Sequence, residues 1–401
     1  MTGVPSRSMP LRVLCVHNAY QHAGGEDSVF RNETALLEAA GHVVERFLVS
    51  NDEISGPIGR IRTALTASYS LRGRRMISDK IKEFRPGVVH VHNFFPQLSL
   101  AIFDACSDAG IASVWTLHNF RVACANGLLF RDGKVCEDCI GRLPAPAVRH
   151  RCYRNSYVGT AAVAAMIGYH SLRGTWHHKV ERFIALNDFA RDVFVRSGLP
   201  ADRVVIKPNF SPPLPEPTSR GERRGALFVG RLSKEKGVHT LVEAWARLDV
   251  PLTIIGDGPK RAEVEAMFAI LPPQRLTWLG EASSERIATE LSLGGIYVWP
   301  GCGEAYGLAY LEAQAAGLPV VAQATAGVPE VVMDGKSGIL TREGDAIAFA
   351  GAVARLLDHP DQRRAMGLAA KDFVFNERSL SAASRRLDII LQQHLGERYG
   401  R

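Results

Sequence analysis

The sequence predicts an α/β protein made of two Rossmann-like, doubly wound domains that face each other across a cleft. Its 401 residues exceed what one ordinary hydrophobic core holds. Short apolar strand patterns alternate with helical patterns in both halves, and a proline-rich stretch separates the halves. Because parallel sheets of this kind bind ligands at the carboxyl ends of their strands, we expect functional residues at those ends.

The first half begins with a strand pattern, a glycine turn and a helical pattern. Residues 11–17 have the pattern of a buried strand, Gly24 and Gly25 lie in the turn, and apolar residues then recur at helical spacing. We assign residues 1–208 to this domain and regard residues 120–155 as a cysteine-rich insertion within it. Its further strands are expected over residues 43–49, 88–92 and 112–117.

The second half repeats the alternation after a break. Residues 207–217 contain five prolines, which stiffen the chain and exclude a helix or a central strand. We therefore predict a linker at 209–222, a second Rossmann-like domain at 223–378, and a C-terminal helix at 379–401 that could return to the first domain. The strands of the second domain are expected over residues 226–229, 252–255, 276–279, 296–299 and 319–322.

Positive charge gathers in the first half of the chain. The formal net charge is +7; residues 1–210 carry 26 Lys and Arg against 18 Asp and Glu, whereas residues 211–401 carry 22 against 23. Either an anionic partner or a solvated basic surface explains this excess. We do not expect nucleic acid as a partner, since no recognised nucleic-acid-binding module occurs, whereas an anionic membrane surface or a phosphate-bearing acceptor fits the charge.

Eight Lys and Arg lie between residues 58 and 85, interleaved with apolar residues at partly helical spacing. This segment is either a basic amphipathic helix on a membrane surface or a domain helix with a solvated basic face. The chain has no run of about 18 apolar residues, and residues 1–10 lack the apolar stretch of a signal peptide. We therefore expect a soluble, cytoplasmic protein.

A phosphate-binding loop is predicted where the strand at 296–299 meets the next helix. The helix starts near Gly307 and Leu308, and its free N–H groups form an anion site. Glu304 lies in the loop and Glu312 about one turn inside the helix, so both carboxylates can accept hydrogen bonds from sugar hydroxyls. The alternative is a surface charge at Glu304 and a helix-dipole role for Glu312.

A second loop brings basic residues to the same edge of the same sheet. Gly230, Arg231 and Lys236 follow the strand at 226–229, and the arginine fork and the compact lysine together suit a diphosphate. A lone arginine or lysine in a turn is usually only solvated. The turn at 256–259 follows a neighbouring strand and could approach a nucleotide.

These residues in this order resemble the glycosyltransferase family 4 pattern over essentially the whole chain. Glu304 and Glu312 complete its E-x7-E motif. The sequence departs from the commonest pattern where Tyr306 replaces phenylalanine and Gln314 replaces methionine, and neither change removes a phosphate or sugar contact. The segments that carry the resemblance are 230–237, 304–308, 317–322 and 327–330.

The resemblance implies a GT-B fold and transfer of a sugar with retention of anomeric configuration. The donor, a UDP- or GDP-sugar, would bind the C-terminal domain, and a glycan or polyprenyl-linked acceptor mainly the N-terminal domain. Arg231 and Lys236 would hold the diphosphate, Glu304 the hydroxyls of the donor sugar, and Glu312 the ribose. Because relatives often use lipid-linked acceptors, we expect peripheral contact with the inner face of a membrane.

The N-terminal domain is expected to complete the site. Gly24 and Gly25 resemble the glycine loop that touches the diphosphate from across the cleft. His118 ends a predicted strand and matches the position that contacts the donor sugar near the reaction centre. A strand-end histidine without this context is more often structural. In this context we expect His118 to function in the reaction.

The expected reaction is transfer of a hexose in the biosynthesis of a surface polysaccharide or lipid-linked glycan. Negative charge grows on the departing diphosphate, and the basic residues and the helix start stabilise it without a required metal. The acceptor hydroxyl attacks from the front side and passes its proton to the leaving phosphate. The alternatives are a GT-B-like sugar-nucleotide epimerase and a non-catalytic sugar-nucleotide binding module.

Four of the seven cysteines cluster in the insertion. Cys136 and Cys139 form a C-x2-C knuckle, Cys124 precedes it by eleven intervening residues, and Cys152 follows it after twelve. In a cytosolic chain, this spacing favours a structural zinc over disulfides. Unliganded thiols or a redox pair are the alternatives.

Overall fold

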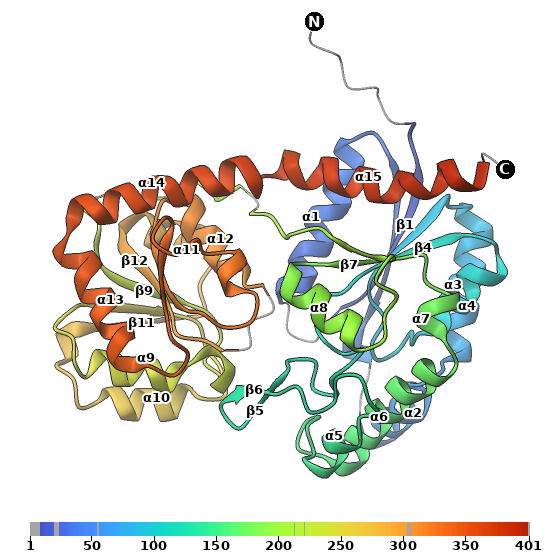
Figure 1. Ribbon diagram of the computed structural model, residues 1–401, viewed down its shortest axis with the longest axis horizontal. Helices are drawn as coiled ribbons and strands as arrows, with labels where there is room; N and C mark the ends of the chain where they lie inside the picture. The colour runs from blue at the N-terminus through green and yellow to red at the C-terminus, as the bar shows by residue number, and fades with distance from the viewer. Residues whose placement is uncertain are drawn as a thin grey trace, which may run out of the picture. The chain divides into compact units, whose positions relative to one another are not determined.

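The computed structural model describes residues 9–19, 24–53, 56–211, 213–219, 221–302 and 306–399. The chain divides into two units (Figure 1). The first unit comprises residues 1–129, 137–208 and 383–401, and the second comprises residues 130–136 and 209–382. Each unit contains one six-stranded sheet, and all strand pairs in these sheets are parallel. The predicted fold class, two parallel-sheet α/β domains, is therefore confirmed.

The sheet of the first unit has the strand order β2-β1-β3-β4-β7-β8. The chain runs from β1 to β2 on one side and then crosses to β3 on the other side, so the topological switch point lies between β1 and β3. The strands are β1 (Arg12–Ala19), β2 (Val43–Ser50), β3 (Val88–Asn93), β4 (Ala112–Thr116), β7 (Arg182–Ala185) and β8 (Val204–Ile206).

The helices of this unit connect and cover its strands. Ser70 caps α3 by accepting a hydrogen bond from the backbone N–H of Gly73, and Asn187 caps α8 in the same way through Ala190. The helices are α1 (Gly25–Ala39), α2 (Gly56–Thr66), α3 (Leu71–Phe84), α4 (Ala101–Asp108), α5 (Ala145–Arg149), α6 (Tyr157–Leu172), α7 (Thr175–His178), α8 (Asp188–Arg196) and the greater part of α15 (Leu380–Tyr399), with a 3-10 turn at Asn51–Glu53.

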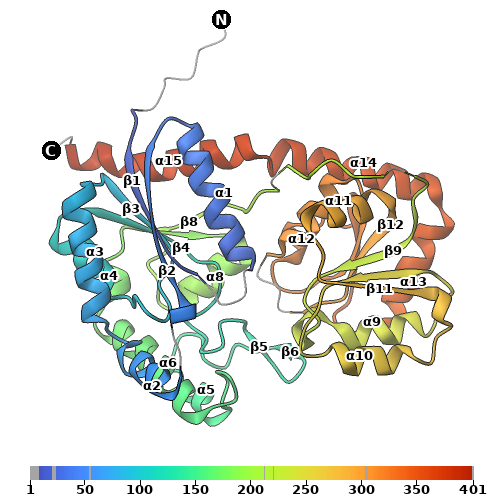
Figure 2. The ribbon, with the colours of Figure 1, turned by 180° about the vertical axis from the view of Figure 1, so that it is seen from behind.

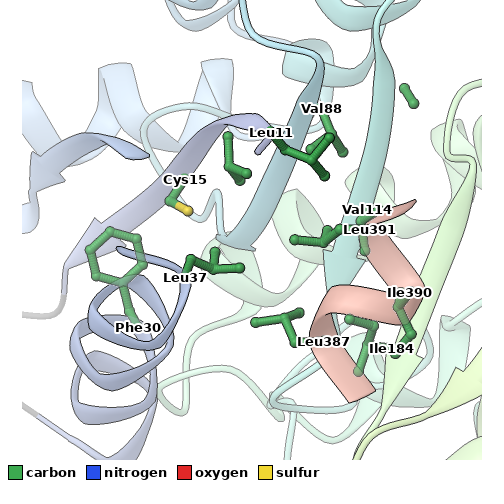
Figure 3. Packing of buried hydrophobic residues seen from close by; sticks show 12 residues of the cluster. Leu11, Cys15, Phe30, Leu37, Val88, Val114, Ile184, Leu387, Ile390 and Leu391 are labelled. Carbon is green, nitrogen blue, oxygen red and sulfur yellow. The ribbon is translucent and has the colours of Figure 1, made fainter. Parts of the chain in front are cut away.

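The C-terminal helix α15 contributes to the core of the first unit. Leu387 and Leu391 are 1% and 0% exposed and belong to one cluster with residues of β1, α1, β3, β4 and β7. Figure 3 shows Leu391 beside Val114 of β4, with Ile184 of β7 close to Ile390. The end of the chain therefore packs on the first sheet and buries apolar area there, which stabilises this arrangement.

The sheet of the second unit has the order β11-β10-β9-β12-β13-β14, so its switch point lies between β9 and β12 (Figure 2). The strands are β9 (Arg224–Val229), β10 (Leu252–Ile255), β11 (Leu276–Gly280), β12 (Gly294–Trp299), β13 (Val320–Gln323) and β14 (Gly338–Thr341). The helices are α9 (Val238–Trp245), α10 (Arg261–Phe268), α11 (Ser284–Leu293), α12 (Leu308–Ala315), α13 (Ala346–Asp358) and α14 (Pro360–Glu377), with 3-10 turns at Lys234–Lys236, Pro273–Arg275 and Val328–Glu330.

Two connecting segments, residues 207–217 and the β5-β6 hairpin, have structural features of their own. The described residues of 207–217 form neither helix nor strand, as expected from the prolines, but Phe210 is buried and the N–H of Ser211 donates to the carbonyl of Arg378 at 3.0 Å. The hairpin of β5 (Phe130–Arg131) and β6 (Lys134–Val135) lies in the cysteine-rich insertion, yet it clusters with the second unit. None of the described helices is long and apolar enough to cross a membrane.

Candidate active site

Two loops meet at the switch point of the second sheet. The loop after β9 ends at Gly237, and the loop after β12 begins at Pro300. The N–H of Cys302 donates to the carbonyl of Glu235 at 2.9 Å, which ties the loops together. Gly237 has φ +70°, and a Cβ there would lie 1.8 Å from the carbonyl oxygen of Pro300. Only glycine permits this close approach of two backbones.

A third loop, after β10, packs on the loop after β9. The N–H of Leu232 donates to the carbonyl of Asp257 at 2.9 Å, and the N–H of Gly230 donates to the carbonyl of Ile255 at 2.9 Å. A Cβ on Gly256 would lie 2.0 Å from the carbonyl oxygen of Gly230. The predicted glycine turns thus lie against one another at the carboxyl edge of the sheet, as the parallel topology requires.

The basic residues of the β9 loop differ in burial. Lys236 is half-buried, and its Nζ lies 4.9 Å from the ring centroid of Trp299, where the ring quadrupole attracts the ammonium. Arg231 and Lys234 are exposed. Trp299 in turn stacks on Phe228 with 5.1 Å between centroids. The sheet core therefore supports Lys236, while the guanidinium of Arg231 extends from the loop into solvent.

Helix α12 begins directly after Gly307, which has φ +77°. Its neighbour Tyr306 is buried, and its hydroxyl donates to the carbonyl of Asn209 at 2.9 Å. Tyrosine, in place of the phenylalanine of the common family pattern, therefore adds a hydrogen bond within the second unit. Leu308 is the first residue of the helix, so its N–H group is among those without an intrahelical acceptor. Glu304 lies outside the described residues.

Glu312 of this helix is half-buried as a residue, and its carboxyl group is largely shielded from water. Burial raises its pKa from 4.5 to about 6. No described residue donates a hydrogen bond to its side chain, so the protein leaves the acceptor capacity of this carboxylate unused. Gln314, the other departure from the family pattern, donates from Nε2 to the carbonyl of Val331 at 2.9 Å. Its role is structural, since it joins α12 to the turn at Val328–Glu330.

The glycine turn and the strand-end histidine lie at the corresponding edge of the first sheet. Gly24 precedes α1, and its N–H donates to Asp27 Oδ2 at 2.7 Å. Asp27 Oδ1 lies 2.9 Å from His17 Nε2. Asn119 donates to Glu26 Oε1 at 2.8 Å, which links the segment after β4 to the first turn of α1. The contacts of Gly24 and Asn119, which are adjacent in sequence to Gly25 and His118, therefore place Gly25 and His118 at the same edge of the first sheet.

His118 is half-buried and neutral. Burial lowers its pKa to about 3, and its Nε2 lies 3.1 Å from Nδ1 of His92. The two imidazoles stack with 5.3 Å between centroids. A neutral histidine can present one donor or one acceptor to a ligand, but no positive charge.

Comparison with known proteins shows the family. The model described as Glycosyltransferase Family 4 matches residues 23–211, and the model described as Glycosyl transferases group 1 matches residues 214–373. The chain belongs to glycosyltransferase family 4. The first model matches the N-terminal segment with the glycine turn and His118, and the second matches the segment with Lys236 and Glu312.

Curated relatives match part of this family 4 chain. The alpha-D-kanosaminyltransferase of Streptomyces kanamyceticus is 34% identical over 229 residues, which are 52% of this chain and 59% of the relative. The GDP-mannose-dependent alpha-(1-6)-phosphatidylinositol monomannoside mannosyltransferase of Mycolicibacterium smegmatis is 29% identical over 207 residues, 48% of this chain and 54% of the relative. The matches thus span little more than half the length of these relatives.

Solved structures share the fold over nearly the whole family 4 chain. Sucrose-phosphate synthase from Thermosynechococcus elongatus superimposes with a TM-score of 0.72 at 18% identity, covering 96% of this chain and 100% of that one. A protein of Anabaena solved in complex with UDP-glucose gives a TM-score of 0.65 at 16% identity, covering 96% and 100%. The fold is therefore GT-B, as the resemblance implied.

Sequence reasoning missed a buried polar cluster of this family 4 protein. Glu33 of α1 and Lys207, which follows β8, form an ion pair whose side chains are 1% and 0% exposed. His90 and His92 of β3 lie beside this pair, with His92 Nε2 3.6 Å and His90 Nε2 4.0 Å from Glu33 Oε2. The two histidines at alternate positions of a predicted strand were the available signal, because alternate residues share one face.

Each of the four clustered cysteines is half-buried. Cys136 belongs to the second unit, and Cys124, Cys139 and Cys152 belong to the first. The zinc site that their spacing predicts stays a prediction.

Proposed function

We propose that this protein is a retaining glycosyltransferase that transfers a hexose from a nucleotide-diphosphate sugar to a glycan or lipid-linked acceptor. One observation carries the proposal: the switch point of the second sheet combines a supported ammonium, a helix start and a buried carboxylate without a described donor. Lys236, Gly307 and Glu312 supply these features. Membership of glycosyltransferase family 4 supports the same activity.

In this proposal the second unit binds the donor. Lys236 and Arg231 neutralise the diphosphate, and the N–H groups at the start of α12 bind its oxygens. Glu312 accepts hydrogen bonds from the ribose hydroxyls, and Glu304 accepts them from the sugar. As the anomeric C–O bond breaks, negative charge accumulates on the leaving phosphate, so the basic residues stabilise the transition state more than the ground state.

The first unit contributes the glycine turn and His118. Gly24 and Gly25 allow backbone to approach the diphosphate without a side chain between them. The neutral imidazole of His118 hydrogen-bonds a hydroxyl of the donor sugar near the reacting carbon. The acceptor hydroxyl attacks from the side on which the leaving group departs and transfers its proton to the leaving phosphate oxygen. The arrangement of these residues requires no metal ion for the reaction.

The donor is a UDP- or GDP-sugar in this proposal, and the acceptor belongs to a surface polysaccharide or polyprenyl-linked glycan. A relative is named as a GDP-mannose-dependent enzyme, and a structural neighbour was solved with UDP-glucose. A thermal-shift screen of UDP-, GDP- and ADP-sugars identifies the donor. The anomeric configuration of the product, followed by proton NMR, tests retention. An inverted product, or stabilisation by none of the nucleotide sugars, would contradict the proposal.

Two lysines of one loop provide a matched pair of variants. Lys236→Ala removes the ammonium held over Trp299, whereas Lys234→Ala removes an exposed ammonium two residues away. We expect the first to lower turnover of the selected donor about 100-fold, the scale for loss of one group that stabilises developing charge. The second should change turnover less than twofold. Equal turnover in the two variants would remove the assigned role of Lys236.

We also propose that the first unit contacts an anionic membrane from the cytoplasmic side. The segment 58–85 forms two helices, and Ile77 and Ile81 of α3 pack into the domain, so α3 is a domain helix with a basic outer face. Leu65 at the end of α2 and Leu71 at the start of α3 are 78% and 68% exposed. Apolar side chains beside basic ones suit the membrane interface.

Flotation with vesicles of phosphatidylglycerol and phosphatidylcholine tests this contact. We expect flotation that weakens with salt and with Leu65→Ser/Leu71→Ser, while the exposed control Leu368→Ser on α14 floats like the unmodified protein. Failure to float at low salt with anionic lipid would refute the proposal.

A structural zinc held by the four cysteines is a separate proposal, which rests on their spacing in the sequence. Metal analysis of the purified protein tests it directly. One zinc per chain, lost in Cys139→Ser, would support the site. Absence of zinc from protein purified without chelators would exclude it.

A further inference from the structure

A chain of four buried or half-buried side chains begins at His118 and ends at Lys207. His118 Nε2 lies 3.1 Å from His92 Nδ1, and the other nitrogen of His92 lies 3.6 Å from Glu33 Oε2. The second oxygen of Glu33 binds the ammonium of Lys207. The four residues come from β4, β3, α1 and the end of β8, so the parallel sheet brings together positions that are 26 to 174 residues apart.

Glu33 is ionised in this setting. Burial opposes ionisation, but Lys207 together with His90 and His118 outweighs it, and the pKa of the Glu33 carboxyl lies below its ordinary value. Its Oε2 has no hydrogen-bond partner among the described residues, and neither has His92 Nε2. Glu33 Oε2 can accept a hydrogen bond and His92 Nε2 can donate one, so the two atoms suit each other as partners.

The rings are held in this order by their surroundings. Phe30 meets His92 edge to face with 5.2 Å between ring centroids, and His118 stacks on the same ring with 5.3 Å between centroids. His90 Nε2 is engaged by the hydroxyl of Thr116 at 2.8 Å. His92 is therefore the histidine that connects Glu33 to His118.

The direction of the hydrogen bonds follows from the charge. A carboxylate only accepts, so it favours the His92 tautomer with the proton on Nε2. His92 Nδ1 is then bare and accepts from His118 Nε2–H. Because the neutral His118 carries its one ring proton on Nε2, its Nδ1 has no proton and can accept a hydrogen bond from a ligand. We propose that Glu33 is a positioning residue, which acts through His92 to make His118 a hydrogen-bond acceptor towards its ligand.

A bound metal ion explains the cluster less well. Glu33, His90 and His92 do offer ligand atoms within 4.8 Å of one another. The ammonium of Lys207 binds the same carboxylate, so a cation here would face a second cation in a buried place where little water screens them.

The expected consequence for catalysis rests on the proposed function, whereas the tautomer does not. An acceptor nitrogen at His118 selects a hydroxyl of the donor sugar that donates its proton. If the proton of His118 moved to Nδ1, an N–H donor would face that hydroxyl. The hydroxyl would then have to rotate so that its oxygen accepts the hydrogen bond. The loss should appear in turnover, because the basic residues proposed to hold the diphosphate, Arg231 and Lys236, lie in the second unit.

The test uses the full-length protein labelled with ¹⁵N in the histidine rings. Long-range ¹H–¹⁵N correlation spectra show which ring nitrogen is protonated, and His118→Gln assigns the signal. We expect His118 to carry its proton on Nε2. A protonated Nδ1 in the unmodified protein would overturn the proposal at once.

Two variants test the cause. Glu33→Leu/Lys207→Met replaces the buried ion pair by apolar groups, an exchange that proteins often tolerate, whereas removing one partner alone would leave a buried charge. His92→Phe keeps the stacked ring without its nitrogens. We expect both to move the proton of His118 to Nδ1 wholly or in part. An unchanged His118 pattern in both folded variants would refute the role of Glu33.

His42 serves as the internal control in the same spectra. Its Nδ1 accepts from the N–H of Leu11 at 3.0 Å, and its Nε2 lies 3.1 Å from Asp388 Oδ1, so its proton should remain on Nε2 in every folded variant. With the nucleotide sugar selected in the thermal-shift screen, we expect turnover to fall about 10- to 100-fold in both variants, the scale for loss of a group that orients a functional histidine. Donor affinity should change less than threefold. A changed tautomer with unchanged turnover would uphold the positioning by Glu33 and refute the catalytic role proposed for His118.

Discussion

Binding of the nucleotide sugar should strengthen as the pH rises from 5 to 8, because Glu312 must ionise to accept hydrogen bonds from the ribose. Burial raises its pKa to about 6 from an ordinary value of 4.5. In the free protein the carboxylate is then about 10% ionised at pH 5 and about 99% ionised at pH 8. Hydrogen bonds from the ribose favour the charged form, so binding lowers the pKa and releases a proton.

The magnitude follows from the two pKa values. If the bound carboxyl returns to its ordinary pKa of 4.5, the dissociation constant at pH 5 is about eight times that at pH 8, or about 1.2 kcal/mol. Isothermal titration calorimetry with the selected nucleotide sugar measures this change. UDP itself is unsuitable, because a terminal phosphate titrates near pH 6. His118 is no competing cause, since its pKa of about 3 keeps it neutral throughout the range.

Glu312→Gln provides the control. An amide does not titrate, so its affinity should vary less than twofold over the same pH range. It mimics the protonated acid, which on these pKa values binds about 30 times more weakly than the carboxylate, so at pH 5 the variant should bind about fourfold more weakly than the unmodified protein. Affinity of the unmodified protein that stays constant, or that weakens as the pH rises, would refute the assignment of Glu312 to the ribose. A pH dependence that persists in Glu312→Gln would place its origin in another group.

Three further predictions test the structure. Glu312→Gln should be about 2 kcal/mol more stable than the unmodified protein at pH 8 and equally stable at pH 4. The reason is that the folded unmodified protein, in which the pKa of Glu312 is raised from 4.5 to about 6, loses stability as the pH rises through this range. Thermal melts at both pH values measure the difference. Gly237→Ala should abolish donor binding or folding of the second unit, whereas Gly344→Ala, with a similar φ of +75° but nothing within 4 Å of the added Cβ, should cost only about 1–2 kcal/mol in urea unfolding; equal effects would show that contact with Pro300 is unimportant. Leu391→Ala should destabilise the first unit by about 2–5 kcal/mol and Ile389→Ala, 55% exposed on the same helix, by less than about 1 kcal/mol; similar midpoints in the two variants would mean that α15 does not pack on this core in solution.

Local patterns in the sequence were enough to locate most of both sheets. The strands expected at 43–49, 88–92, 252–255 and 296–299 coincide with β2, β3, β10 and β12 to within two residues at either end. β3, β10 and β12 were visible because strands buried on both faces are largely apolar, whereas β2 is a partly exposed edge strand in which apolar residues still predominate. β7, β8 and β14 were missed; β7 begins with an arginine, and β8 has only three residues.

The positions in the fold of the residues proposed to bind the donor were predictable from the strand pattern. Lys236, Gly307 and Glu312 follow strands β9 and β12, and parallel strands place their carboxyl ends at one edge. Sequence alone therefore determined the fold class, the two sheets and the edge at which function is expected. The close contact between Gly237 and Pro300, and the burial that raises the pKa of Glu312, became known only from the packing of the loops.

Only the tertiary structure decided which distant side chains meet. Glu33, His92 and Lys207 carry no shared motif, and their partnership depends on the order of β1, β3, β4 and β8 in the first sheet and on the face that α1 presents to it. The same holds for α15, whose Leu387 and Leu391 are buried in one cluster with Leu11 of the first unit. Periodicity reports whether a residue is buried, because burial repeats with the local backbone, but the identity of its neighbours is set by contacts between elements far apart in the chain.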